Sequence, residues 1–200
     1  DMAKSRGLGD VYKRQMILRA LFLGTKKEIE WAFFAAPLKF RPELIYRLND
    51  FLNNKTLINP IFALGKMLEN KNKKIRILGA DLWLAYESNL STIQFDYNTF
   101  NDVLSNSGKK KKILPNTPFL EWHYIKNNFF LKPNQLLKHK KKLSNIKISI
   151  IQSDYDLLCP PQTSFNFAYG LSNCKVIRIA SAGHYICLLY TSDAADDRLR

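Results

Sequence analysis

Two short apolar runs near the end of the sequence are separated by one segment of helical length. Residues 146–153 (IKISIIQS) are almost continuously apolar and residues 174–181 (CKVIRIAS) alternate, and both patterns indicate β-strands. The segment between them, residues 160–171, begins with proline and ends near Gly170, as a helix does. A strand, a helix and a strand at this spacing predict a βαβ unit, whose strands are parallel. We therefore expect an α/β fold built on a parallel sheet.

A third strand is predicted near the start of the sequence, at residues 17–23 (ILRALFL). The long segment that follows carries apolar residues at helical spacings, with breaks rich in asparagine, proline and lysine. A mainly helical segment between two strands of a parallel sheet is typical of a cap. The expected organisation is a sheet strand at residues 16–23, a helical cap at residues 24–143, and the end of the sheet domain at residues 144–186.

The two ends of the chain follow no periodic pattern. They read GDVYKRQ at residues 9–15 and CLLYTSDAADD at residues 187–197. Codons for residues 10–15 and 187–192 can be written as reverse complements offset by one base, and the resulting DNA is similar to the end of a transposase-based sequencing adapter. We therefore expect residues 1–15 and 187–200 to be adapter-derived and non-native, with residues 16–186 belonging to a truncated open reading frame.

Positive charge dominates the composition, with a formal net charge of +14. The lysines gather in residues 70–74, 108–112 and 138–142. These clusters lack interleaved arginine or aromatic residues and lie between apolar segments, so we expect solvated loops rather than a surface for nucleic acid or membrane. The apolar run at residues 16–24 is too short to span a bilayer.

Two cysteines, Cys159 and Cys174, lie outside the expected adapter segments. This number provides neither a disulfide framework nor the ligand spacing of a metal site. We therefore predict a reducing, cytoplasmic environment and no metal ion.

Acidic and histidine residues follow the last two predicted strands. DYDLLCPP begins at Asp154, and AGHYI contains His184. Active sites of open α/β sheets gather at the carboxyl ends of parallel strands, and Asp before His ends the Ser…Asp…His order of α/β hydrolases. His184 is then the predicted general base, and Asp156 orients its ring. Asp154, two residues earlier, is an alternative acid. The sequence contains no G-x-S-x-G, so a nucleophile elbow of that pattern is absent from it.

Five blocks of the sequence follow the order of the motifs of one known family. They are LRALFLGTKKEIEW (18–31) beside the pattern LRGIFL-x-x-x-x-E-[ILV]-x-W, LWLAYESNLST (82–92) beside W-x-x-W-E-x-x-x-S, LEWHYIKNNFFLKPNQLL (120–137) beside E-x-H-Y-F-x-x-x-x-F, IIQSDYDLLCPPQTSFNFA (150–168) beside G-R-Y-D-x-x-C-P, and ASAGHYI (180–186) beside an A-G-H loop. Together they resemble the prolyl iminopeptidases over essentially residues 16–186.

The resemblance implies an α/β hydrolase with a helical cap. Such an enzyme releases N-terminal proline from peptides through a Ser-Asp-His triad and needs no metal or organic cofactor. Asp156 matches the triad aspartate, because it precedes x-x-Cys-Pro, and His184 matches the triad histidine. The missing serine and the oxyanion-hole loop would lie upstream, so the 200-residue chain itself is expected to be inactive.

Four further residues match the substrate site of that family. Glu87 and Glu121 match cap glutamates that bind the free amino end of the substrate, and Phe22 and Arg19 match residues that line or brace the proline pocket. The expected partners are peptides with N-terminal proline. The chain departs from the family pattern where Ser153 and Asp154 replace Gly-Arg and where Ala20 replaces Gly.

Two other classes of function compete with this interpretation. The first is another α/β hydrolase, with an ester or an epoxide as substrate. The second is a non-enzymatic binder of polyanions built on the lysine clusters, whose affinity would fall steeply with salt.

Overall fold

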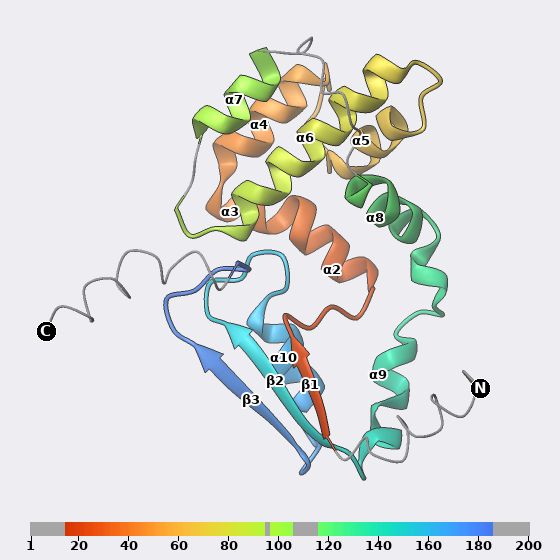
Figure 1. Ribbon diagram of the computed structural model, residues 1–200, viewed down its shortest axis with the longest axis vertical. Helices are drawn as coiled ribbons and strands as arrows, with labels where there is room; N and C mark the ends of the chain where they lie inside the picture. The colour runs from red at the N-terminus through yellow and green to blue at the C-terminus, as the bar shows by residue number, and fades with distance from the viewer. Residues whose placement is uncertain (1–14, 95–96, 106–115, 186–200) are drawn as a thin grey trace, which may run out of the picture.

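Three parallel strands form the sheet of the protein. The computed structural model describes residues 15–94, 97–105 and 116–185. The strands β1 (Gln15–Arg19), β2 (Lys147–Ser153) and β3 (Cys174–Ile179) lie side by side with β2 in the centre (Figure 1). Helix α10 (Pro161–Ala168) connects β2 to β3. The predicted α/β fold, with its parallel sheet and its βαβ unit, is therefore confirmed.

The first strand ends four residues earlier than its apolar run predicts. The backbone N–H of Ala20 still donates to the carbonyl of Ile151, at 3.1 Å. At Ala20, however, φ is +49°, and this left-handed conformation turns the chain out of the sheet. Residues 21–23 are therefore part of a loop. They are apolar because they pack against the two hydrophobic clusters.

The expected adapter segments contribute one residue to the described structure. Gln15 pairs with Lys147 at the start of β1. Residues 1–14 and 187–200, and the lysine cluster at 108–112, lie outside the described residues.

The described chain between β1 and β2 is mainly helical, as predicted. Its elements are α2 (Lys26–Glu30), the π-helical η1 (Trp31–Ala35), α3 (Ala36–Phe40), α4 (Pro42–Phe51), α5 (Ile61–Leu68), α6 (Lys73–Ser91), α7 (Tyr97–Ser105), α8 (Thr117–Lys126), the 3-10 turn η2 (Asn128–Phe130), α9 (Gln135–His139) and the 3-10 turn η3 (Lys140–Leu143). In Figure 1, α3 to α7 lie beyond the carboxyl ends of the strands, whereas α9 lies beside the sheet. None of the helices in the described ranges is both long and apolar enough to cross a membrane.

Local signals in the sequence explain where several helices begin. Thr25 and Glu28 form a capping box at α2, in which each side chain binds the other residue's backbone N–H. Asn72 caps α6 by accepting from the N–H of Lys74. Proline stands in the first turn of α4, α8 and α10, where its missing N–H costs no helical hydrogen bond.

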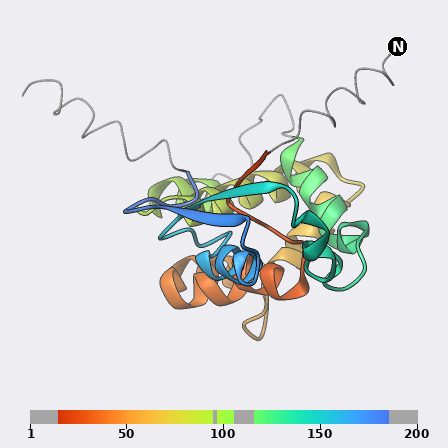
Figure 2. The ribbon, with the colours of Figure 1, turned by 90° about the horizontal axis from the view of Figure 1, so that it is seen from below.

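Two hydrophobic clusters hold the helices and the sheet. The sheet cluster joins Leu23, Ile148, Ile150, Phe167 and Leu171, with Leu137 and Leu143 packed against it. Figure 2 shows α10 against one face of the sheet. The helical cluster is larger, and its fully buried members include Leu44, Leu48, Leu64, Leu82, Trp83 and Phe100.

The loops after β1 and β2 connect the two clusters. Leu158 and Cys159, from the loop after β2, are buried members of the helical cluster. Ala20 and Phe22, from the loop after β1, pack against the same cluster. The carboxyl ends of these strands are therefore held against the helices, and the predicted catalytic residues lie at this junction.

One lysine of the cluster at residues 138–142 has a structural partner. Lys140 Nζ donates to the carbonyl oxygens of Asn166, Phe167 and Tyr169, at 3.2, 3.1 and 2.6 Å. These carbonyls belong to the last turn of α10, where the helix dipole favours a cation. Lys140 is therefore half-buried and bound to the end of α10.

We expect Lys140→Met to lower the free energy of unfolding by about 1 kcal/mol, because it removes a charged donor from three helix-terminal carbonyls. Lys141→Met is the matched control, since Lys141 is its exposed neighbour in η3. Urea unfolding followed by circular dichroism would measure both variants. Equal effects of the two substitutions would show that the contact with α10 contributes nothing.

Candidate active site

The loop after β2 holds the carboxylate of Asp156 in a fixed position. Asp156 is only 3% exposed. Its Oδ1 accepts the backbone N–H groups of Leu158 and Cys159, at 3.0 and 2.8 Å. This is an aspartate turn, in which a short acidic side chain binds the backbone that follows it. Because two N–H groups bind Oδ1 and fix the orientation of the carboxylate, Oδ2 is left to accept a hydrogen bond from one side.

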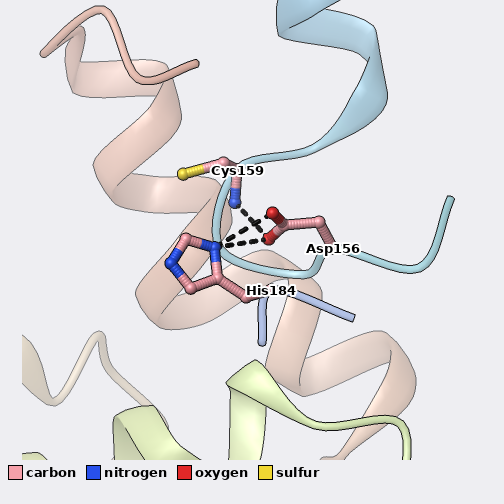
Figure 3. A group of neighbouring side chains, drawn as sticks. All are labelled: Asp156, Cys159 and His184. Carbon is pink, nitrogen blue, oxygen red and sulfur yellow. Dashed lines mark hydrogen bonds and ion pairs between the residues drawn. The ribbon is translucent and has the colours of Figure 1, made fainter. Parts of the chain in front are cut away.

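His184 lies on that side. Its Nδ1 lies 3.0 Å from Oδ2 and 3.1 Å from Oδ1 of Asp156, as Figure 3 shows. A carboxylate at Nδ1 favours the tautomer that carries its proton there, which leaves Nε2 unprotonated and able to accept a proton. The pair has the geometry of a general base and its orienting acid.

The backbone on both sides of His184 is also fixed. Arg19 Nη2 donates to the carbonyl oxygen of His184 at 2.7 Å. The N–H of Tyr185 donates to the carbonyl oxygen of Ser91, the last residue of α6, at 3.0 Å. A Cβ atom on Gly183 would lie 2.7 Å from the same oxygen, so this close approach requires glycine. Close packing against the end of α6 thus explains the glycine of the A-G-H motif.

Asp154 is engaged elsewhere. Its two carboxylate oxygens accept from Arg178 Nε and Nη2 on β3, at 2.8 and 2.9 Å. This bidentate pair lies on the surface. Of the two candidate acids, the structure therefore brings Asp156 to His184.

The two predicted cap glutamates lie on neighbouring helices and interact through their charges. Glu87 is on α6 and Glu121 is on α8. Trp83 Nε1 donates to Oε2 of Glu121 at 2.6 Å. Burial and the negative charge of Glu87 raise the pKa of Glu121 to about 7. Burial also raises the pKa of Glu87, while the charge of His184 opposes that rise. The carboxylates and the imidazole thus share one partly buried region.

Phe22 is held by an aromatic contact. It lies in the loop after β1, and its ring meets that of Phe129 edge to face, with 5.4 Å between centroids. Arg19, at the end of β1, reaches the His184 carbonyl and so supports the histidine loop. The structure thus connects both predicted pocket residues to elements around the site.

Sequence reasoning did not single out Glu28, which orders the loop that carries Phe22. Glu28 is buried, with 6% of its surface exposed. Its Oε1 accepts the N–H of Leu23 at 2.9 Å, and its Oε2 accepts the N–H and hydroxyl of Thr25 at 2.8 and 2.7 Å. The T-x-x-E spacing of a capping box was the available signal.

Three side chains of this site also form a donor set that could ligate a metal. One ligand atom each from Asp156, Cys159 and His184 lies within 4.8 Å of the others (Figure 3), and zinc accepts all three types. Burial, followed by the charges of nearby carboxylates, strongly raises the pKa of the Cys159 thiol. The protonated thiol is a poor ligand, and the carboxylate already binds the imidazole. The absence of a metal in the function stays a prediction.

No protein-family model matches the chain. It is 25% identical over 170 residues to a probable proline iminopeptidase of Leptolyngbya boryana, covering 84% of this chain and 51% of that protein. It is also 25% identical over 171 residues to a proline iminopeptidase of Arabidopsis thaliana, covering 84% and 44% of the two chains. A putative proline iminopeptidase of Mycoplasma pneumoniae is 25% identical over 183 residues, with coverage of 85% and 54%.

The chain thus spans about half the length of the curated relatives it matches. These similarities extend over most of the chain and agree with the α/β fold. They show that the chain is similar, over most of its length, to proteins named proline iminopeptidase.

Proposed function

We propose that the chain carries the aspartate and histidine of a prolyl iminopeptidase, a serine exopeptidase that releases N-terminal proline. The hydrogen-bonded pair of Asp156 and His184 carries this proposal. Nε2 of His184 would take the proton from a serine hydroxyl as it attacks the proline carbonyl, and would return it to the leaving amine. Water would then hydrolyse the acyl-enzyme by the same proton transfers. Asp156 would stabilise the imidazolium.

Glu87 and Glu121 would bind the free amino end of the substrate. An N-terminal proline carries a secondary ammonium, which can leave water only if charged acceptors replace its hydration. Two partly buried carboxylates beside the imidazole supply such acceptors, and Trp83 holds one of them through its indole N–H. A blocked or internal residue would leave both carboxylates without a cation, which favours exopeptidase specificity.

Phe22 would pack against the pyrrolidine ring, and Arg19 would brace the site through the histidine loop. Both roles rest on the family resemblance and on the contacts of these residues with Phe129 and His184.

The nucleophilic serine and the oxyanion hole would come from sequence upstream of the chain. The sequence contains no G-x-S-x-G and spans about half of its relatives, which supports this placement. Translation of the upstream DNA in the same frame should reveal that motif.

A cytoplasmic location stays a prediction from cysteine usage. The alternative function is an α/β hydrolase that acts on esters or epoxides. In that case Glu87→Gln and Glu121→Gln, made separately, would leave the turnover of proline amides unchanged.

In the protein extended by its upstream reading frame, we expect Asp156→Asn to lower kcat for a proline 4-nitroanilide by about 10⁴-fold, because the amide favours the wrong tautomer of His184. Asp154→Asn is the matched control two residues away. Since it breaks only a surface ion pair, its effect should stay below about threefold. Full activity of the Asp156 variant, or an equal loss in both variants, would refute the assignment of the triad.

A second prediction concerns the pH dependence of amine binding by the 200-residue chain. Below its pKa of about 7, the Glu121 carboxyl is neutral and attracts a cation weakly. Prolinamide should therefore bind more tightly as pH rises from about 5 to about 8, with ionisation of Glu87, whose pKa is also raised, acting in the same direction. Tryptophan fluorescence measures binding, because Trp83 donates to Glu121.

Glu121→Gln should weaken prolinamide binding at the upper pH by about tenfold and reduce its pH dependence. Glu69→Gln is the control, since Glu69 is an exposed glutamate paired with Lys126 on the surface. A pH profile that is the same in the Glu121 variant and the unmodified chain would place the titrating group elsewhere.

A further inference from the structure

The segment after α8 has an unusual backbone. Asn128, Phe129 and Phe130 are consecutive residues in the left-handed region, with φ of 49°, 55° and 55°. Asparagine adopts this conformation readily, but side chains with a bulky Cβ substituent do so at a cost. Such a run persists only where the surrounding contacts determine it. The contacts of the two phenylalanines therefore indicate what maintains it.

Phe129 points toward the loop that follows β1. Its ring meets Phe22 edge to face at 5.4 Å and stacks on Tyr124 at 6.4 Å, with interplanar angles of 64° and 17°. Gly24, whose φ is +67°, lies under the same ring. A Cβ atom there would be 3.0 Å from Cγ and Cδ2 of Phe129, which is closer than such atoms normally approach. The loop thus leaves room for the ring of Phe129.

This contact joins two parts of the proposed substrate site that are far apart in sequence. Phe22 lies between β1 and α2, whereas Glu121 and Tyr124 lie on α8, directly before the left-handed segment. Phe129 and Phe22 are both partly buried, and both pack against the helical cluster. The ring of Phe129 therefore fixes the orientation of the Phe22 ring relative to the helix that carries Glu121.

We infer that Phe129 is a positioning residue that orients Phe22 and thereby sets the ring size accepted at the N-terminal residue of the substrate. This inference rests on the proposed function. An amine held by Glu121 fixes where the substrate ring begins, and the face of Phe22 limits how far that ring extends. Because Phe129 meets the Phe22 ring edge to face, a shift of Phe22 to admit a larger substrate ring would break that contact, so a five-membered ring is favoured.

The neighbouring phenylalanine provides a matched control. Phe130 has the same backbone conformation and is 64% exposed. Its ring contacts are with His123 and Tyr124, at 5.5 and 5.9 Å between centroids. A substitution at Phe130 therefore changes the same strained segment and leaves the Phe22–Phe129 contact in place.

The experiment compares the binding of prolinamide and of its six-membered-ring analogue, pipecolinamide, to the 200-residue chain by tryptophan fluorescence. Phe129→Leu removes the aromatic edge and keeps a side chain of intermediate size. We expect it to lower the preference for prolinamide about threefold to tenfold, while Phe130→Leu leaves the ratio unchanged. Phe129→Gly is the second variant, because glycine suits the left-handed backbone and removes the whole ring.

The outcomes separate this inference from the function on which it rests. Absence of saturable prolinamide binding by the unmodified chain would overturn both. Binding by the unmodified chain with the same ring preference in both Phe129 variants would overturn only the inference. A lower melting temperature with an unchanged ratio would assign Phe129 a purely structural role and would also overturn it.

Discussion

The parallel pairing of β2 with β3 is the constraint on which the rest of the site depends. Its register places Ser153 beside Ile179, so the two strands end at the same edge of the sheet. Asp156 follows one end by three residues and His184 follows the other by five. Because the strands are parallel, these loops leave in the same direction, and a short aspartate turn is enough to bring the carboxylate to the imidazole.

The helices make this edge of the sheet a less polar environment. Leu158 and Cys159 pack into the helical cluster immediately after Asp156, so the carboxylate is desolvated but bound by N–H groups. Glu87 and Glu121 lie in the same region, and burial raises the pKa of both. Two backbone N–H groups bind the carboxylate of Asp156, whereas the indole N–H of Trp83 binds that of Glu121.

Sequence patterns predicted the elements of this fold better than their ends. The apolar runs indicated all three strands, but the first run continues through residues 21–23, which form a loop. A loop buried against helices needs the same apolar side chains as a buried strand, so the pattern does not show where the strand ends. The order of strands and acidic residues left Asp154 and Asp156 open, since both follow β2, and only the family resemblance favoured Asp156. Only the position of Arg178 on the adjacent strand, a tertiary feature, explains why Asp154 turns away. The left-handed run around Phe129 has no local signature beyond Asn128, and the ring of Phe129 packs closely over the distant loop at Gly24.

The close contact between Gly183 and the end of α6 has a mechanical consequence. The carbonyl of Ser91 binds the N–H of Tyr185, while the Ser91 hydroxyl donates to the carbonyl of Glu87 one turn earlier. The histidine loop is therefore attached to the turn of α6 that carries Glu87. Because His184 is also bound by Arg19 of β1 and by Asp156, the histidine loop connects this helix to the sheet.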